Sequence, residues 1–183
     1  MNLQTFGKPA PPRSVGGTFC GWAAYYCRRY DRAITTLRHA LELDPSFALA
    51  SWFLVQSYLH AGELHNAAEE IEKSIRLSGA HPAALALQSV AYYALGRRKK
   101  AISVLDNIRS LANQRRVEPY FIAYAIAPYG DNDTTFSWLE RAYEDRSGWL
   151  LFLPIDPGFD VLRTDPRLID LMQRINPFRI TQV

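Results

Sequence analysis

The stretch YLHAGELHNAAEEIEKS, residues 58–74, contains the pattern that decides the fold. Gly62 lies inside it, and glycine readily adopts the positive φ with which a chain leaves the last turn of a helix. Beyond it, Ala67, Ile71 and Ser74 are spaced i, i+4 and i+7, so they share one stripe of a second helix. The two small residues let a neighbouring helix approach closely around the larger one. The stretch therefore predicts two antiparallel helices joined by a glycine turn.

The same pattern recurs when the chain is shifted against itself by 34 residues. Gly96 and Gly130 repeat the glycine, and Arg28 takes its place in the first copy. Because a single pair cannot bury its apolar stripe alone, successive pairs must stack as a solenoid. The first helices are expected near 18–28, 46–60, 83–95 and 117–128, and their partners near 31–43, 64–77, 98–112 and 132–145.

The period, the small-large-small stripe, the glycine turn and the residues Tyr58, Tyr92 and Pro45 resemble the tetratricopeptide repeat (TPR) family. The resemblance implies an all-α fold, namely a right-handed α-solenoid of about four antiparallel helix pairs with a C-terminal capping helix. The copies would span 14–47, 48–81, 82–115 and 116–149, and the first and last of them are degenerate.

The two ends of the chain depart from the repeat. Residues 1–13 are rich in proline and predict a flexible lead-in, whereas residues 150–183 predict a capping segment. In that segment Asp156 and Asp165 each precede a proline, a combination typical of helix starts. For the helix near 132–145, Asn132 or Asp133 is the expected cap.

The TPR resemblance also implies a concave groove, lined by the first helix of each pair, that holds a peptide. In this chain the corresponding positions carry many aromatic and few charged side chains, which suits an apolar or mixed segment of a partner protein. Binding of a chaperone C-terminal carboxylate is not expected, because the Lys, Asn and Arg of such clamps are missing. The alternative, that these side chains pack against adjacent helices or the capping segment, stays open. The expected groove residues are Trp22, Tyr26, Trp52, Gln56, Leu59, His60, Ala86, Val90, Tyr93, Tyr120 and Tyr124.

Motifs for catalysis and metal binding are lacking. The chain contains no GxSxG, HExxH, Walker or GxGxxG pattern, so neither an enzyme nor a cofactor is expected. His60 and His65 have no Cys or carboxylate at a recognised ligand spacing, and a metal site is not expected. Cys20 and Cys27 lie two helical turns apart, too far for a disulfide, and are expected to be buried free thiols.

Composition narrows the classes of partner. A net charge of +3 and a 48% hydrophobic content indicate a soluble globular chain without the concentrated basic face of a nucleic-acid-binding protein. The basic run Arg97–Lys100 is read as a solvated turn in preference to a contact with phosphates or an acidic partner. No apolar run approaches the ~18 residues of a spanning helix, and no secretory signal is evident, so no membrane association and a cytoplasmic location are expected.

The leading hypothesis is a noncatalytic adaptor that binds a protein or peptide segment in its groove, and the open ends of the array could also mediate self-association. A rival hypothesis rests on residues 156–175, which resemble the closing segment of TPR regions in larger bacterial regulators. In it the chain is a sensory fragment of a transcription regulator or kinase whose effector domain lies on another polypeptide. A third, a small-ligand hydrolase, requires a closed pocket with a paired acid and base.

Overall fold

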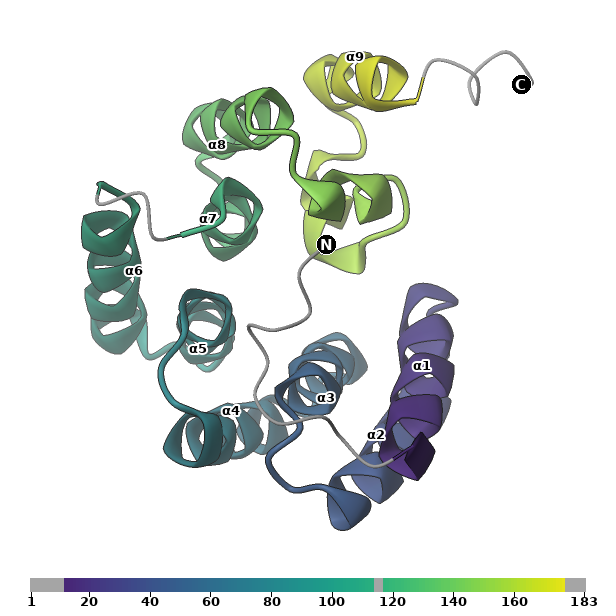
Figure 1. Ribbon diagram of the computed structural model, residues 1–183. Helices are drawn as coiled ribbons and strands as arrows, with labels where there is room; N and C mark the ends of the chain where they lie inside the picture. The colour runs from purple at the N-terminus through teal and green to yellow at the C-terminus, as the bar shows by residue number, and fades with distance from the viewer. Residues whose placement is uncertain (1–11, 114–116, 177–183) are drawn as a thin grey trace. The chain divides into compact units, whose positions relative to one another are not determined.

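The computed structural model describes residues 12–113 and 117–176, and its regular elements there are all helices (Figure 1). The lead-in predicted for residues 1–13 lies outside the described residues except for Pro12 and Arg13, which begin the first helix. The predicted all-α solenoid of antiparallel helix pairs is confirmed. The α-helices are α1 (Pro12–Tyr26), α2 (Tyr30–Leu43), α3 (Ala48–Ala61), α4 (Leu64–Ser78), α5 (Pro82–Ala94), α6 (Arg98–Asn113), α7 (Pro119–Ile126), α8 (Asn132–Glu144) and α9 (Pro166–Ile175). Within residues 117–176 they are accompanied by the 3₁₀ helices η2 (Ala127–Tyr129), η3 (Gly148–Phe152) and η4 (Pro157–Leu162).

The second helices of the pairs keep the sequence period. They begin at Tyr30, Leu64, Arg98 and Asn132, each 34 residues after the last. Their predicted stripes are buried, because the small residues bring each helix close to its neighbours. The stripe positions, none more than 5% exposed, are Ala33, Leu37, Ala40, Ala67, Ile71, Ser74, Ala101, Leu105, Ile108, Thr135, Leu139 and Ala142.

The turns between paired helices share one backbone geometry. At Gly62 the chain takes φ +80°, the Gly62 N–H donates to the Leu59 carbonyl, and the Glu63 N–H donates to the Tyr58 carbonyl. This is the Schellman ending of a helix, and the same two bonds recur at Gly96 and Arg28, and also at Arg146, which lies after α8 and outside the turns between paired helices. The two arginines adopt φ +58° and +55°, a region that costs a side chain with a Cβ roughly 1–2 kcal/mol. The predicted glycine column is thus a column of left-handed residues, whatever the amino acid.

We expect Arg146→Gly to raise the free energy of unfolding by roughly 1 kcal/mol, because glycine takes this φ without strain. The change is measured as the shift of the urea midpoint followed by circular dichroism. The neighbouring Asp145, at φ −75°, serves as the control, since glycine there only adds freedom to the unfolded chain. An equal or larger gain in Asp145→Gly would contradict the strain at Arg146.

Several helices begin at residues that accept a hydrogen bond from the first turn. Asp156 and Asp165 cap η4 and α9, as predicted, by accepting from the Gly158 and Arg167 backbone N–H groups. For α8 the prediction of Asn132 or Asp133 is wrong, because Asp131 takes this role and accepts from Thr134.

At the start of α5, His81 Nδ1 accepts from the Ala84 backbone N–H at 3.4 Å. Burial lowers the pKa of His81, so the folded state favours the neutral ring, which can accept this bond. Since the pKa is lower in the folded than in the unfolded chain, the unfolded chain takes up the proton first as the pH falls.

We therefore expect the stability contributed by His81 to be complete above about pH 6.5 and to decrease as the pH falls from there through the folded pKa. His81→Asn supplies a cap that does not titrate. Thermal midpoints at neutral and mildly acidic pH should drop further in the unmodified chain than in the variant. Identical drops would show that the cap does not depend on this proton.

The contacts divide the chain into two compact units, residues 1–104 and 105–183. In the first unit α1 packs on α2 and α3, and α3 also contacts α2, α4 and α5. In the second, α7 packs on α8, η2 contacts η4, and α9 contacts α8. Among the described residues, no helix has the length and hydropathy needed to cross a membrane.

The packing of helix α1 shows on which side of the helix the two cysteines lie. Its buried stripe is formed by Ser14, Thr18, Gly21 and Tyr25, and a Cβ on Gly21 would lie 2.4 Å from Leu37 Cγ. Glycine is therefore needed for this close helix contact. Because that stripe takes the inward side of α1, both cysteines turn outward, and the prediction of buried thiols is wrong. The two free, exposed cysteines are Cys20 and Cys27.

Candidate functional site

In the first unit the predicted groove residues lie on α1, α3 and α5, and the structure sorts them by exposure. Four are buried and hold these helices in place, whereas the others are half-buried and reach the surface with part of their side chain. The buried ones are Trp52, Gln56, Ala86 and Val90. The half-buried ones are Trp22, Tyr26, Leu59, His60 and Tyr93.

The aromatic residues of α1 and α3 form one cluster around Phe53, which is fully buried. Trp22 stacks on its ring at 5.3 Å between centroids, and Tyr26 meets it edge-on at 5.9 Å. Tyr25 lies at 5.7 Å. Such contacts fix ring orientation beyond what burial alone achieves. The half-buried rings of Trp22 and Tyr26 are therefore held rigidly from beneath.

A polar contact supports the same cluster. The Tyr25 hydroxyl donates to Gln56 Oε1 at 2.8 Å, and the His60 ring stacks on Tyr30 at 5.4 Å. Gln56 was expected to face a partner, but its amide oxygen serves the contact between α1 and α3. Helical periodicity missed this because α3 is apolar on all sides, as expected of a helix surrounded by neighbours.

In the second unit the predicted groove residues of α7 contact the chain's own C-terminal segment. The Tyr120 hydroxyl donates to Asp156 Oδ2 at 2.7 Å, and both residues are buried. The Phe159 ring meets Tyr120 and Tyr124 edge-on, at 5.3 and 5.8 Å. This face of α7 is therefore occupied by residues 156–159.

Arg163 holds this segment in its bent course. Its guanidinium donates to the backbone carbonyls of Leu153 and Asp156, at 3.1 and 3.0 Å, and pairs with Asp160 at 3.2 Å. The carboxylate of Asp156 in turn accepts from the Gly158 N–H at 2.9 Å. Both ends of the turn are thus tied by charge-assisted hydrogen bonds.

Gly158 allows the backbone to lie directly on α7. A Cβ at this position would lie 2.1 Å from Tyr124 Cε2, closer than packed atoms can come, whereas a Cβ on Gly148 would meet nothing within 4 Å.

We expect Gly158→Ala to lower the free energy of unfolding by about 1–3 kcal/mol, because the methyl group must displace a buried ring or the backbone. Gly148→Ala, in the same segment but in open space, should change it by less than about 0.5 kcal/mol. Urea unfolding followed by tyrosine and tryptophan fluorescence measures both. Equal effects would mean that the segment does not lie against Tyr124.

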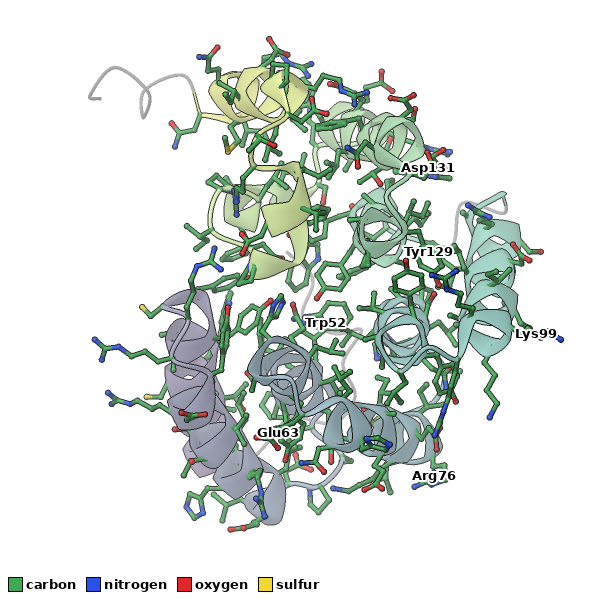
Figure 2. All side chains as sticks on the ribbon, turned by 180° about the vertical axis from the view of Figure 1, so that it is seen from behind. Trp52, Glu63, Arg76, Lys99, Tyr129 and Asp131 are labelled. Carbon is green, nitrogen blue, oxygen red and sulfur yellow. The ribbon has the colours of Figure 1, made fainter. Side chains whose placement is uncertain are left out.

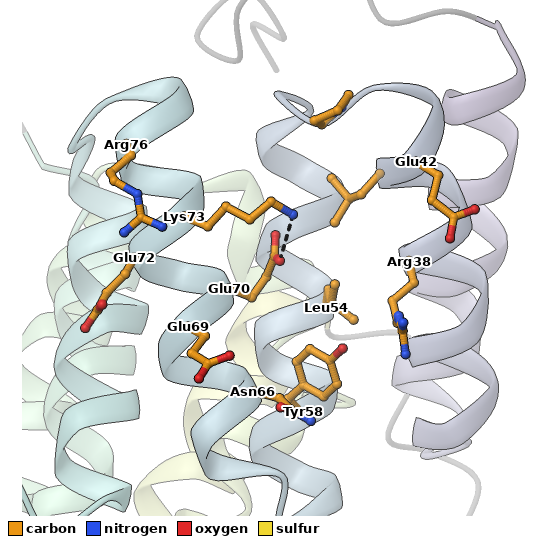
Figure 3. Close-up of a pocket in the computed structure, with 12 residues that line it drawn as sticks. Arg38, Glu42, Leu54, Tyr58, Asn66, Glu69, Glu70, Glu72, Lys73 and Arg76 are labelled. Atoms are coloured by element: carbon orange, nitrogen blue, oxygen red, sulfur yellow. Dashed lines mark hydrogen bonds and ion pairs between the residues drawn. The ribbon is translucent and has the colours of Figure 1, made fainter.

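The structure adds a surface feature that sequence reasoning missed, an open groove of about 830 Å³ between α2 and α4 (Figure 3). Leu54 and Tyr58 of α3 lie at its floor. Burial raises the pKa of Tyr58, and Glu63 and Glu70 add to this while Arg38 opposes it, so the hydroxyl stays protonated and can donate. The groove carries both signs of charge, on Arg38, Glu42, Glu69, Glu70, Glu72, Lys73 and Arg76, and the neutral amide of Asn66 also lines it.

Part of that charge is already used within the first unit. Glu70 accepts from the Ser51 hydroxyl at 3.0 Å and pairs with Lys73 at 3.2 Å, and Glu72 accepts from the Tyr92 hydroxyl at 2.8 Å. Because the remaining charges are mixed, this groove does not select a partner of either sign.

The described residues contain no group of three or more His, Cys, Asp or Glu side chains that could hold a metal ion. His60 packs against the rings of Tyr25 and Tyr30, which also contact each other, and His65 is exposed on α4.

Comparison with known proteins matches part of the chain to a family and most of it to solved folds. A family model described as tetratricopeptide repeat matches residues 21–47, within the copy predicted to be degenerate. A crystal structure of MamA protein is similar over 93% of this chain and 98% of that one, with 15% identity and a TM-score of 0.51. A second MamA crystal structure covers 84% of this chain and 91% of its own, with 17% identity and a TM-score of 0.47. No curated protein matches the sequence significantly.

Proposed function

The chain is a tetratricopeptide repeat protein, and we propose that it is a noncatalytic module that binds a segment of a partner protein. The observation that carries the proposal is the set of uncharged, half-buried side chains on its first helices. Trp22, Tyr26 and Leu59 each present part of their surface while their bases are fixed in the helix packing. Rigid aromatic anchors of this kind contribute most of the affinity in protein interfaces.

The buried members of the predicted groove have a supporting role in this proposal. Gln56 and Trp52 lie beneath the surface of α3, and Ala86 and Val90 are buried in α5. They keep the anchors in one orientation, so that little side-chain freedom is lost when a partner binds. In this proposal only the half-buried residues of α1, α3 and α5 contact the partner.

In the second unit, the contacts of α7 give an example of the kind of segment that a first helix of a pair can hold. There, two tyrosines of α7 hold residues 156–159 by one hydrogen bond from a hydroxyl to a carboxylate and by edge-on contacts to a phenylalanine. By analogy, a partner segment for α1 and α3 should carry a large apolar side chain near a hydrogen-bond acceptor. Tyr120 and Tyr124 themselves are excluded from this partner contact, because their face is occupied.

We expect the double substitution Tyr26→Ala and Leu59→Ala to weaken binding of such a segment by about tenfold or more, because it removes two anchors. The probes are peptides selected from a random library against the unmodified chain. Their affinities for each variant are measured by fluorescence anisotropy. Circular dichroism verifies that the variant remains helical, and Tyr26→Leu replaces Tyr26→Ala if it does not.

A matched control removes apolar surface elsewhere. Leu43 and Leu77 are 44% and 51% exposed and lie outside the predicted groove. Leu43→Ala with Leu77→Ala should leave the selected peptides bound with unchanged affinity. Equal losses of affinity in both double variants, or failure to select any peptide, would contradict the proposed binding surface.

A further inference from the structure

The turn between α5 and α6 carries four consecutive cations, Arg97, Arg98, Lys99 and Lys100, and all four are exposed. The whole chain has a net charge of +3, so everything outside this turn carries a net charge of −1. In the part of the chain that the structure describes, none of the four forms an ion pair with a carboxylate. Four adjacent positive charges thus lie on the surface here without an ion pair inside the described part of the chain.

The fold does not require these cations. They lie at the start of α6, where the helix dipole disfavours positive charge by about 0.3–1 kcal/mol per group. At the position of Arg97, two of the other three pairs have a carboxylate, namely Glu63, which accepts from Asn66, and Asp131, which caps α8, whereas the first pair has Arg29. The helix dipole thus favours a carboxylate at this end of α6, and the four cations are present in spite of that.

Two of the four cations are held in place by tyrosine rings. The Arg98 guanidinium lies 5.9 Å from the centroid of Tyr93, and Lys100 Nζ lies 5.6 Å from that of Tyr92. Tyr92 is itself anchored by its hydrogen bond to Glu72 at 2.8 Å. Lys99 projects outward from α6 (Figure 2). Cations that are partly ordered before binding lose less freedom when an anion pairs with them.

Among anionic partners, the geometry favours a polypeptide. An arginine guanidinium group donates two parallel hydrogen bonds to one carboxylate, and Arg97 and Arg98 supply two such groups in succession. Single-stranded nucleic acid would need open ring faces on which bases stack, but Tyr92 is only 8% exposed and the half-buried ring of Tyr93 already carries the Arg98 guanidinium. An anionic bilayer would need a second anchor beside so short a basic run.

We propose that this turn docks an acidic segment, rich in Asp or Glu, of the partner protein. The inference rests on the proposed function, since it assigns a second contact to the same interaction module. It places the contact at the α5–α6 turn and outside the anchors on α1 and α3. Charge steering by this turn also speeds association with an acidic partner and weakens as salt increases.

The test uses the full chain and a fluorescein-labelled peptide of about twelve residues that alternates Glu and Ala, read by anisotropy at about 0.05 M and 0.15 M salt. Arg97→Gln with Lys99→Gln removes the two cations that do not lie on tyrosine rings. The matched control is Arg29→Gln with Arg32→Gln, two exposed arginines at the turn between α1 and α2. Both variants lower the net charge by the same amount.

The expected result is a loss of about tenfold in affinity in the first variant and less than about twofold in the control, with the difference reduced at the higher salt. Equal losses would overturn the proposal, because they would indicate non-specific attraction. Absence of binding to the acidic peptide would overturn it too. So would tighter binding of a single-stranded oligonucleotide of equal charge or of vesicles containing phosphatidylserine.

The two proposals fail separately. The variant Tyr26→Ala with Leu59→Ala should bind the acidic peptide as the unmodified chain does, because its substitutions are not in the α5–α6 turn. If the selected apolar peptides fail while the acidic peptide binds through Arg97 and Lys99, the anchor surface is wrong and the basic turn stands. If the selected apolar peptides bind as expected while the acidic peptide does not, only the proposal for the basic turn is wrong.

Discussion

Close approach of the second helices to their neighbours is the constraint on which the rest of the structure depends. In three of the four pairs a buried stripe places two small residues around one larger side chain, as in Ala67, Ile71 and Ser74, and in α6 Ile108 replaces the second small residue. Only small residues permit this distance, and the larger one fills the space between the helices. Because no pair can cover its own stripe, each pair needs the next one. The fixed period of helix starts follows from this requirement.

Turn geometry follows from the same constraint. To place two helices side by side within a few residues, the chain must reverse direction at once, and the Schellman ending with its left-handed residue does so. Gly62 and Gly96 meet this need without strain, while Arg28 adopts the same conformation despite its side chain. The packing of the helices thus outweighs a local backbone cost of roughly 1–2 kcal/mol.

Sequence periodicity was sufficient to predict the helix pairs, but it was insufficient to predict which side chains reach the surface. The starts of α4 and α6 agree with prediction because glycine turns and buried stripes are local signals. Whether the Gln56 side chain points outward or inward is not determined by neighbouring residues in the sequence. It depends on Tyr25, 31 residues earlier, whose hydroxyl donates to it. Likewise, α7 ends earlier than predicted because Pro128 lacks an N–H group, and η2 continues the chain in its place.

By itself, the sequence determined the fold class, the period, the pairing of helices and the stripe that packs them, since all of these follow from residue size and spacing along the chain. Only the tertiary structure decided which aromatic residues remain partly accessible, and that residues 156–159 occupy the face of α7. These outcomes depend on contacts between residues such as Tyr120 and Asp156, 36 positions apart. No periodic pattern encodes a contact of that kind, because it is created when separate elements meet.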